Sequence, residues 1–163
     1  MNEVLAWALE QARNQTLTLA ADIAPEPTSR SLWILGHLTL GDTYLLSLLG
    51  AEPLSGGFDE LLRKYGPRGA SSGARQDDYD SKAVLMDRLA WLGARRLDTV
   101  RHMKVAELER AMPDAYLART QPTIAHHLHA LVCHEGYHAG QLSAWRQTYG
   151  LPSTAWVFAP QQP

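Results

Sequence analysis

The sequence has little cysteine and no long apolar run, and both shortages exclude whole classes of protein. Cys133 is the only cysteine among 163 residues, so neither an intramolecular disulfide nor a thiolate cluster of the structural-zinc type can form. No apolar run approaches the roughly 20 residues that a membrane-spanning helix needs. The N-terminal segment contains Glu3, Glu10 and Arg13, unlike a secretory signal peptide. We therefore expect a cytoplasmic protein that does not span a membrane.

An excess of positive charge is also missing. The 15 Lys and Arg residues are balanced by 17 Asp and Glu residues, and the formal net charge is -2. Because nucleic-acid binding needs clustered Lys and Arg beside the phosphates, we expect no nucleic-acid ligand. Hydrophobic residues make up 45% and charged residues 20%, which is typical of a globular protein. The length is that of one domain, and we expect a single domain over residues 1–163.

Apolar residues recur with helical spacing in four segments and alternate with strand spacing in none. The predicted helices cover about 4–22, 29–49, 81–103 and 124–149. The buried stripe of the third is expected to contain Leu85, Leu89, Leu92, Arg96 and Val100. Ser81 and Thr123 can cap the third and fourth helices. The sequence therefore predicts an all-α fold.

Residues 51–80 are rich in Gly, Pro, Ser and charge and show no sustained period. We predict a long crossover loop there, between the second and third helices. A connection of this length allows the two helices that it joins to run parallel. Such long loops are uncommon in compact domains, and those that occur are often functional.

The pattern with the clearest chemistry lies in CHEGYHAGQL. His134 and His138 are four residues apart, so on a helix they project from one face. His37 stands in the middle of the second helix, on a stripe with Trp33 and Leu40. Zinc and nickel accept neutral imidazole, and three protein ligands leave one position open. We predict a three-histidine site for zinc or nickel; the alternative is a hydrogen-bonded core histidine and a chance pair.

Other side chains on the last helix are secondary candidates. Gln141 follows His138 by three residues and can accept its second ring proton, or it is an amide at the edge of the core. His127 precedes His134 by seven residues and is a fallback ligand. We expect a small buried apolar role for Cys133. The remaining histidines are expected at the surface: His102, His126 and His129.

HEGYH also matches the H-E-x-x-H signature of zinc proteases. Those proteases take a third ligand from downstream, but residues 139–163 contain no His, Asp or Glu. They also bind their peptide along a sheet, and no strand is predicted here. Proteolysis is therefore the least favoured function. We expect Glu135 to be a solvated or capping residue, and an acid or base only if it leans into the site.

Three stretches together resemble the DinB superfamily of metal-dependent enzymes, which includes bacterial low-molecular-weight-thiol S-transferases. They are SLWILGHLTLGD, YDSKAVLMDRL and TIAHHLHALVCHEGYHAGQLSAWRQTYGLP, and with the YG of LLRKYGPRG they cover nearly the whole chain. The resemblance implies an up-up-down-down four-helix bundle, often a homodimer, with a long connection between the second and third helices. The family's metal ligands correspond to His37, His134 and His138. Ala139 departs from the pattern, because many relatives have Arg there.

For function, the resemblance implies a metal-dependent enzyme acting on a small molecule, by thiol transfer or hydrolysis. The metal would lower the pKa of a bound thiol or water. The alternative is a non-catalytic metal-binding bundle, acting as a dimeric interaction or stress-response protein. That alternative rests on the lack of a nucleophile, a carboxylate pair or a phosphate-binding loop beside the histidines.

Overall fold

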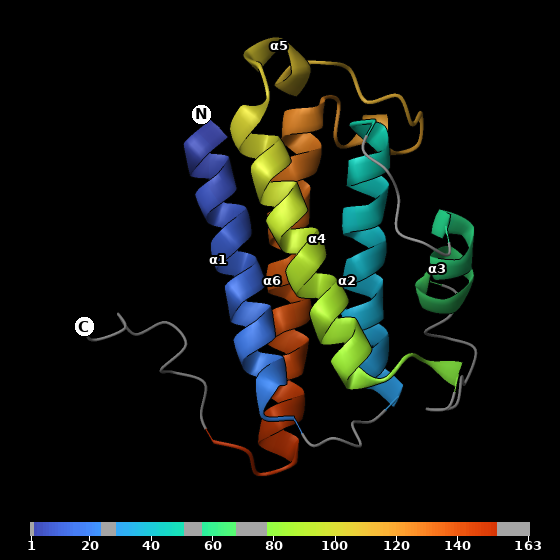
Figure 1. Cartoon of the computed structure of the whole chain (residues 1–163), viewed down its shortest axis with the longest axis vertical. Coiled ribbons are helices and arrows are strands. Elements are labelled where there is room, and N and C mark those ends of the chain that lie inside the picture. The colour runs from blue at the N-terminus through green and yellow to red at the C-terminus, as the bar shows by residue number, and fades with distance from the viewer. Residues whose placement is uncertain (1, 24–28, 51–56, 68–77, 153–163) are drawn as a thin grey trace.

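Four long helices lie side by side in the computed structural model, which describes residues 2–23, 29–50, 57–67 and 78–152 (Figure 1). They are α1 (Asn2–Ala21), α2 (Ser29–Leu48), α4 (Lys82–His102) and α6 (Ile124–Thr148). The shorter elements are α3 (Gly57–Tyr65), α5 (Val105–Leu108) and the 3₁₀ turn η3 (Leu117–Arg119). The described ranges contain no β-strand, and the all-α prediction is confirmed. No described helix is long and apolar enough to cross a membrane.

The directions of the long helices correct one prediction. Figure 1 shows α1 and α6 running one way and α2 and α4 the other. Hydrogen bonds also show that α1 and α4 are antiparallel, because each joins the start of one helix to the end of the other. Asn2 donates to the carbonyl of Met103, and Lys82 donates to the carbonyl of Ala21. Successive long helices therefore run up, down, down and up. The predicted up-up-down-down order is wrong, because α1 and α2 are antiparallel.

Chain length explains this order. Residues 22–28 separate α1 from α2, and seven extended residues span at most about 25 Å. A helix of 20 residues is about 30 Å long, so this connection is too short to return to its far end. The connection between α2 and α4 runs from residue 49 to residue 81 and joins parallel helices, which its length allows.

The segment predicted as a loop contains helix α3, which packs beside α2 (Figure 1). Leu61 and Tyr65 are four residues apart and both are buried. Asp59 and Glu60 lie in the first turn, and basic residues lie in the last, which suits the helix dipole. The prediction of a structureless crossover is therefore wrong for residues 57–65, while residues 51–56 and 68–77 lie outside the described ranges.

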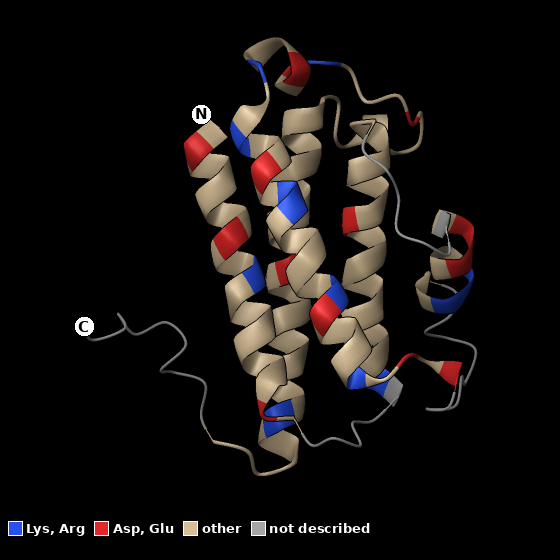
Figure 2. Ribbon diagram, in the orientation of Figure 1, with Lys and Arg blue, Asp and Glu red and all other residues tan. Residues whose placement is uncertain are grey.

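The buried interior has two apolar clusters separated by a layer of charge. One includes Leu19, Leu35, Leu89 and Leu142, and the other is made by residues nearer the opposite ends of the same helices. Between the two levels, each long helix contributes one buried charged side chain: Arg13, Asp42, Arg96 and Glu135. Charged positions occur along all four long helices in Figure 2.

Local sequence signals account for much of α4 and α6. All five residues of the stripe predicted for α4 are buried, Arg96 included. The hydroxyl of Ser81 accepts from the backbone N–H of Val84, and that of Thr123 accepts from the N–H of His126. Both predicted caps are therefore confirmed.

Candidate metal centre

Three imidazoles converge between α2 and α6. His37 comes from the middle of α2, and His134 and His138 come from successive turns of α6. The Nε2 atom of His134 lies 3.1 Å from Nε2 of His37 and 3.1 Å from Nε2 of His138. The three ligand atoms all lie within 4.8 Å of one another. The structure thus contains the predicted cluster of three histidines, and it can hold a metal ion.

The second ring nitrogen of two of these histidines has an acceptor. Nδ1 of His37 donates to the carbonyl of Tyr65 at 2.8 Å, and Nδ1 of His138 donates to Oε1 of Gln141 at 2.9 Å. A neutral imidazole has one ring proton, so Nε2 of both rings carries a lone pair. Both lone pairs face Nε2 of His134, which carries at most one proton and so can donate a hydrogen bond to only one of them. A cation bound by all three Nε2 atoms satisfies each of them.

The spacing also suits a small divalent ion. Zinc binds imidazole nitrogen at about 2.0–2.1 Å, so tetrahedral ligands stand about 3.3 Å apart. The two 3.1 Å separations at His134 are close to that value. Within the cluster only imidazole nitrogens are present, a donor type that zinc, nickel and copper accept.

Burial keeps the cluster neutral. Desolvation is the largest cause that lowers the pKa of His37, His134 and His138. For His138, the nearby charges of His134, His37 and Arg30 lower the pKa further, the hydrogen bond with Gln141 opposes them, and the result is about 4. At neutral pH the rings are therefore uncharged, with a free lone pair on one ring nitrogen, and this is the form that binds metal ions.

Helix α3 and its last residue position His37. The ring of Tyr65 lies against Gly36, where an added Cβ would stand 2.1 Å from the ring carbons. Its hydroxyl donates to Oδ2 of Asp80 at 3.0 Å, and its carbonyl holds Nδ1 of His37. On the other side Trp33 stacks on His37, with ring centres 4.5 Å apart. The role of Tyr65 was not predicted; the four-residue spacing of Leu61 and Tyr65 is the sequence signal that could have revealed an inward helical face.

Glu135 follows a ligand in sequence but lies in the charged layer of the core. Its Oε1 accepts from Nε of Arg13 at 2.5 Å, and its Oε2 accepts from Nη1 of Arg96 at 3.3 Å. Asp42 completes the network by accepting from Arg13 at 2.7 Å and from Arg96 at 2.6 Å. The expectation of a solvated or capping residue is wrong, because Glu135 is only 1% exposed. Both of its oxygens are held by guanidinium groups.

The other candidate ligands lie apart from the cluster. Nδ1 of His127 is 2.6 Å from Oε1 of Gln121, and its ring meets that of Tyr44 edge-on at 5.7 Å. His127 is thus not one of the three clustered histidines.

Cys133 is exposed, which contradicts the expected buried role. The surface positions expected for three histidines are confirmed: His102, His126 and His129.

Comparison of the chain with protein-family models and with curated proteins gave no match.

Proposed function

We propose that this chain is a divalent-metal-dependent enzyme of the DinB type, in which His37, His134 and His138 hold zinc or nickel. The convergence of their three Nε2 atoms carries the proposal. Catalytic metal sites commonly use three protein ligands and leave a position for substrate or water. Two of the rings already have an outer partner that orients them, as metal-bound histidines usually do.

The substrate that we propose is a small molecule, and the reaction is transfer of a low-molecular-weight thiol or a hydrolysis. A divalent ion supplies Lewis acidity, which lowers the pKa of a thiol or of water. The residues of the chain supply orientation: Tyr65 and Trp33 hold the ring of His37, and Gln141 holds that of His138. No carboxylate belongs to the cluster as described.

The geometry does not favour a zinc protease. In the H-E-x-x-H mechanism, the glutamate polarises the water that attacks the peptide. Glu135 has both carboxylate oxygens bonded to Arg13 and Arg96 inside the bundle. It is placed to balance buried charge, so we do not assign it the role of acid or base.

Metal content tests the centre directly. The wild type, His37→Ala and His138→Ala are saturated with zinc or nickel, dialysed and analysed for bound metal, with the exposed His102→Ala as the control. We expect one ion per chain in the wild type and in the control, and little or no bound metal after dialysis in both site variants. Equal metal content in all four proteins would show that the centre lies elsewhere.

Activity and association are tested on the same preparations. The metal-loaded protein is assayed for conjugation of small bacterial thiols to an electrophile and for hydrolysis of small esters, with the metal-free protein as the blank. Metal-dependent turnover supports the proposal that the chain is an enzyme. One bound ion without turnover on either class supports the non-catalytic alternative. The expected homodimer is a prediction that light scattering of the same sample checks.

A further inference from the structure

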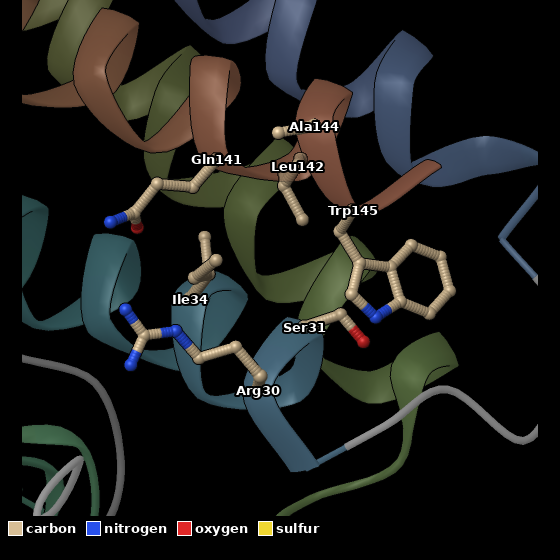
Figure 3. A pocket seen from close by; sticks show the side chains of 7 residues that line it. All are labelled: Arg30, Ser31, Ile34, Gln141, Leu142, Ala144 and Trp145. Atoms are coloured by element: carbon tan, nitrogen blue, oxygen red, sulfur yellow. The ribbon is translucent and has the colours of Figure 1, made fainter. Parts of the chain in front are cut away.

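A pocket opens beside the histidine cluster, between the first turns of α2 and the last turns of α6 (Figure 3). Its volume is about 230 Å³, and its lining is mostly apolar. Ile34, Leu142 and Trp145 form the apolar part, while Arg30 and Gln141 bring polar groups. Sites for drug-sized ligands usually measure about 300–1,000 Å³, so this pocket suits a smaller molecule.

The pocket and the cluster share a boundary. Gln141 lines the pocket, and its Oε1 accepts the hydrogen bond from Nδ1 of His138 at 2.9 Å. Arg30 lines it too, and its Cζ lies 5.4 Å from the centre of the Trp33 ring, which stacks on His37. A small molecule in this pocket therefore lies next to Gln141, which contacts the proposed ligand His138, and next to Arg30, which the ring of Trp33 separates from His37.

The polar groups gather at one side of the pocket. Figure 3 shows the guanidinium of Arg30 and the amide of Gln141 on the same side of Ile34, with the indole of Trp145 on the other. Arg30 is exposed, and no carboxylate among the described residues forms an ion pair with it. The pocket thus offers one available cation and one apolar wall.

We propose that this pocket receives the organic substrate of the metal centre, and that this substrate is a small monocarboxylate with an apolar body. The carboxylate pairs with Arg30 on the side nearer the histidines, and the body lies against Ile34, Leu142 and Trp145. This inference rests on the proposed metal-dependent function for its catalytic meaning. The pocket itself is testable without metal.

A carboxylate fits better than a phosphate group. The planar guanidinium matches the two oxygens of a carboxylate and can bind both at once. A phosphate near neutral pH carries up to two charges and three acceptor oxygens, which calls for several donors or cations. Among the described residues that line the pocket, Arg30 is the only charged one. A single negative charge is therefore the better complement.

Binding of a matched pair of probes tests the proposal. Calorimetric titration compares 3-phenylpropionate with its neutral amide, 3-phenylpropionamide, on metal-free and zinc-loaded protein. We expect the acid to bind about tenfold more tightly than the amide, which corresponds to about 1.4 kcal/mol. Equal affinities for the two probes, or no binding of the acid at millimolar concentration, would overturn the proposal.

Three variants locate the effect. Arg30→Gln should abolish the preference for the acid, and Arg30→Lys should retain part of it. Arg95→Gln is the matched control, because Arg95 also lies over an indole ring, that of Trp91 at 5.1 Å, but away from the pocket. The preference must survive in this control. Ala144→Leu adds bulk to the lining and should weaken both probes; unchanged affinity for both would place their binding elsewhere.

The metal content of each sample separates the two proposals. A preference for the acid that depends on Arg30, in protein that binds neither zinc nor nickel, supports the pocket and refutes the metal centre. Bound metal with equal affinity for acid and amide supports the metal centre and refutes the pocket. Bound zinc together with the preference supports both.

Discussion

The bundle buries two groups of polar side chains on adjoining turns of α6, and the two groups are built differently. The core network pairs Arg13 and Arg96 with Asp42 and Glu135, so each charge has an opposite partner. The three histidines are neutral, and their Nε2 atoms face one another. In the first group every charge is paired within the chain, although Nε of Arg96 has no hydrogen-bond partner among the described residues. The second group needs a cation to satisfy its three nitrogens. This difference separates stabilising residues from residues that bind a ligand.

The adjacent residues Glu135 and His134 give the sharpest test of that difference. Glu135→Ala leaves two buried guanidinium groups with one carboxylate, and removing one partner of a buried pair costs about 3–5 kcal/mol. We expect the free energy of unfolding to fall by that amount in urea denaturation. In metal-free protein, His134→Ala should cost only about 1 kcal/mol, as an ordinary substitution does. Similar losses of unfolding free energy in the two variants would contradict the distinction between stabilising residues and residues that bind a ligand.

The next largest effect is expected where α3 meets α2. Gly36→Ala places a methyl group 2.1 Å from the ring carbons of Tyr65, so the ring must move. We expect a loss of about 1–3 kcal/mol in stability, as for other overpacked sites, and weaker metal binding because His37 loses the carbonyl that orients it. Urea denaturation and metal titration measure the two effects.

Gly136→Ala is the matched control for this substitution. An added Cβ at Gly136 meets nothing within 4 Å, and the residue lies inside α6. Because alanine favours a helix interior by about 0.5–1 kcal/mol over glycine, this variant should be more stable than the wild type. If both glycine variants respond alike, the contact between α3 and α2 does not matter.

Replacement of Gln141 should lower the metal affinity without lowering the free energy of unfolding. Its Oε1 orients His138 from the edge of the core, and loss of such an outer partner typically lowers metal affinity about 10–100-fold. We expect Gln141→Ala to lie near the tenfold end, because an amide oxygen carries no full charge. The exposed Gln147→Ala is the control. A change in unfolding free energy without a change in metal affinity would assign Gln141 to packing alone.

Periodicity and spacing predicted the four long helices and the pair His134 and His138, whereas the choice of His37 as the third ligand also rested on the resemblance to a known family. Residues four apart on a helix share a face whatever surrounds them, so His134 and His138 needed no tertiary information. The stripe of α4 was predicted with Arg96 in it, but its partners on three other helices were not. Buried charge pairs depend on contacts between distant segments, and a single sequence does not show which charges meet.

The same limit explains the errors about α3, Glu135 and Cys133. Residues 57–65 were assigned to a loop because Gly-, Pro- and Ser-rich sequence lies on both sides of them. Leu61 and Tyr65 hold α3 against α2. Glu135 and Cys133 flank His134, and small differences in helix rotation decide which of them faces inward. Helix order was also misjudged, although the short segment 22–28 indicated an antiparallel pair.

The last effect that we predict is the part of the pH dependence of stability that comes from the histidines. Burial lowers the pKa of all three, and that of His138 falls from 6.5 to about 4. Between those values the unfolded chain binds more protons than the folded one, so stability falls as the pH falls. The stability that the neutral ring contributes is present above pH 6.5 and is lost as the pH approaches 4.

Urea denaturation of metal-free protein at pH 7, 6 and 5 measures this dependence. Other groups also titrate in this range, so the informative quantity is the difference between the wild type and His138→Asn, which lacks the titrating ring. We expect a shallower decline in His138→Asn than in the wild type. Saturating zinc should make the wild-type decline steeper, because protons compete with the metal for the same nitrogens. Parallel curves for the wild type and His138→Asn, with or without zinc, would mean that His138 is protonated as easily in the bundle as in water.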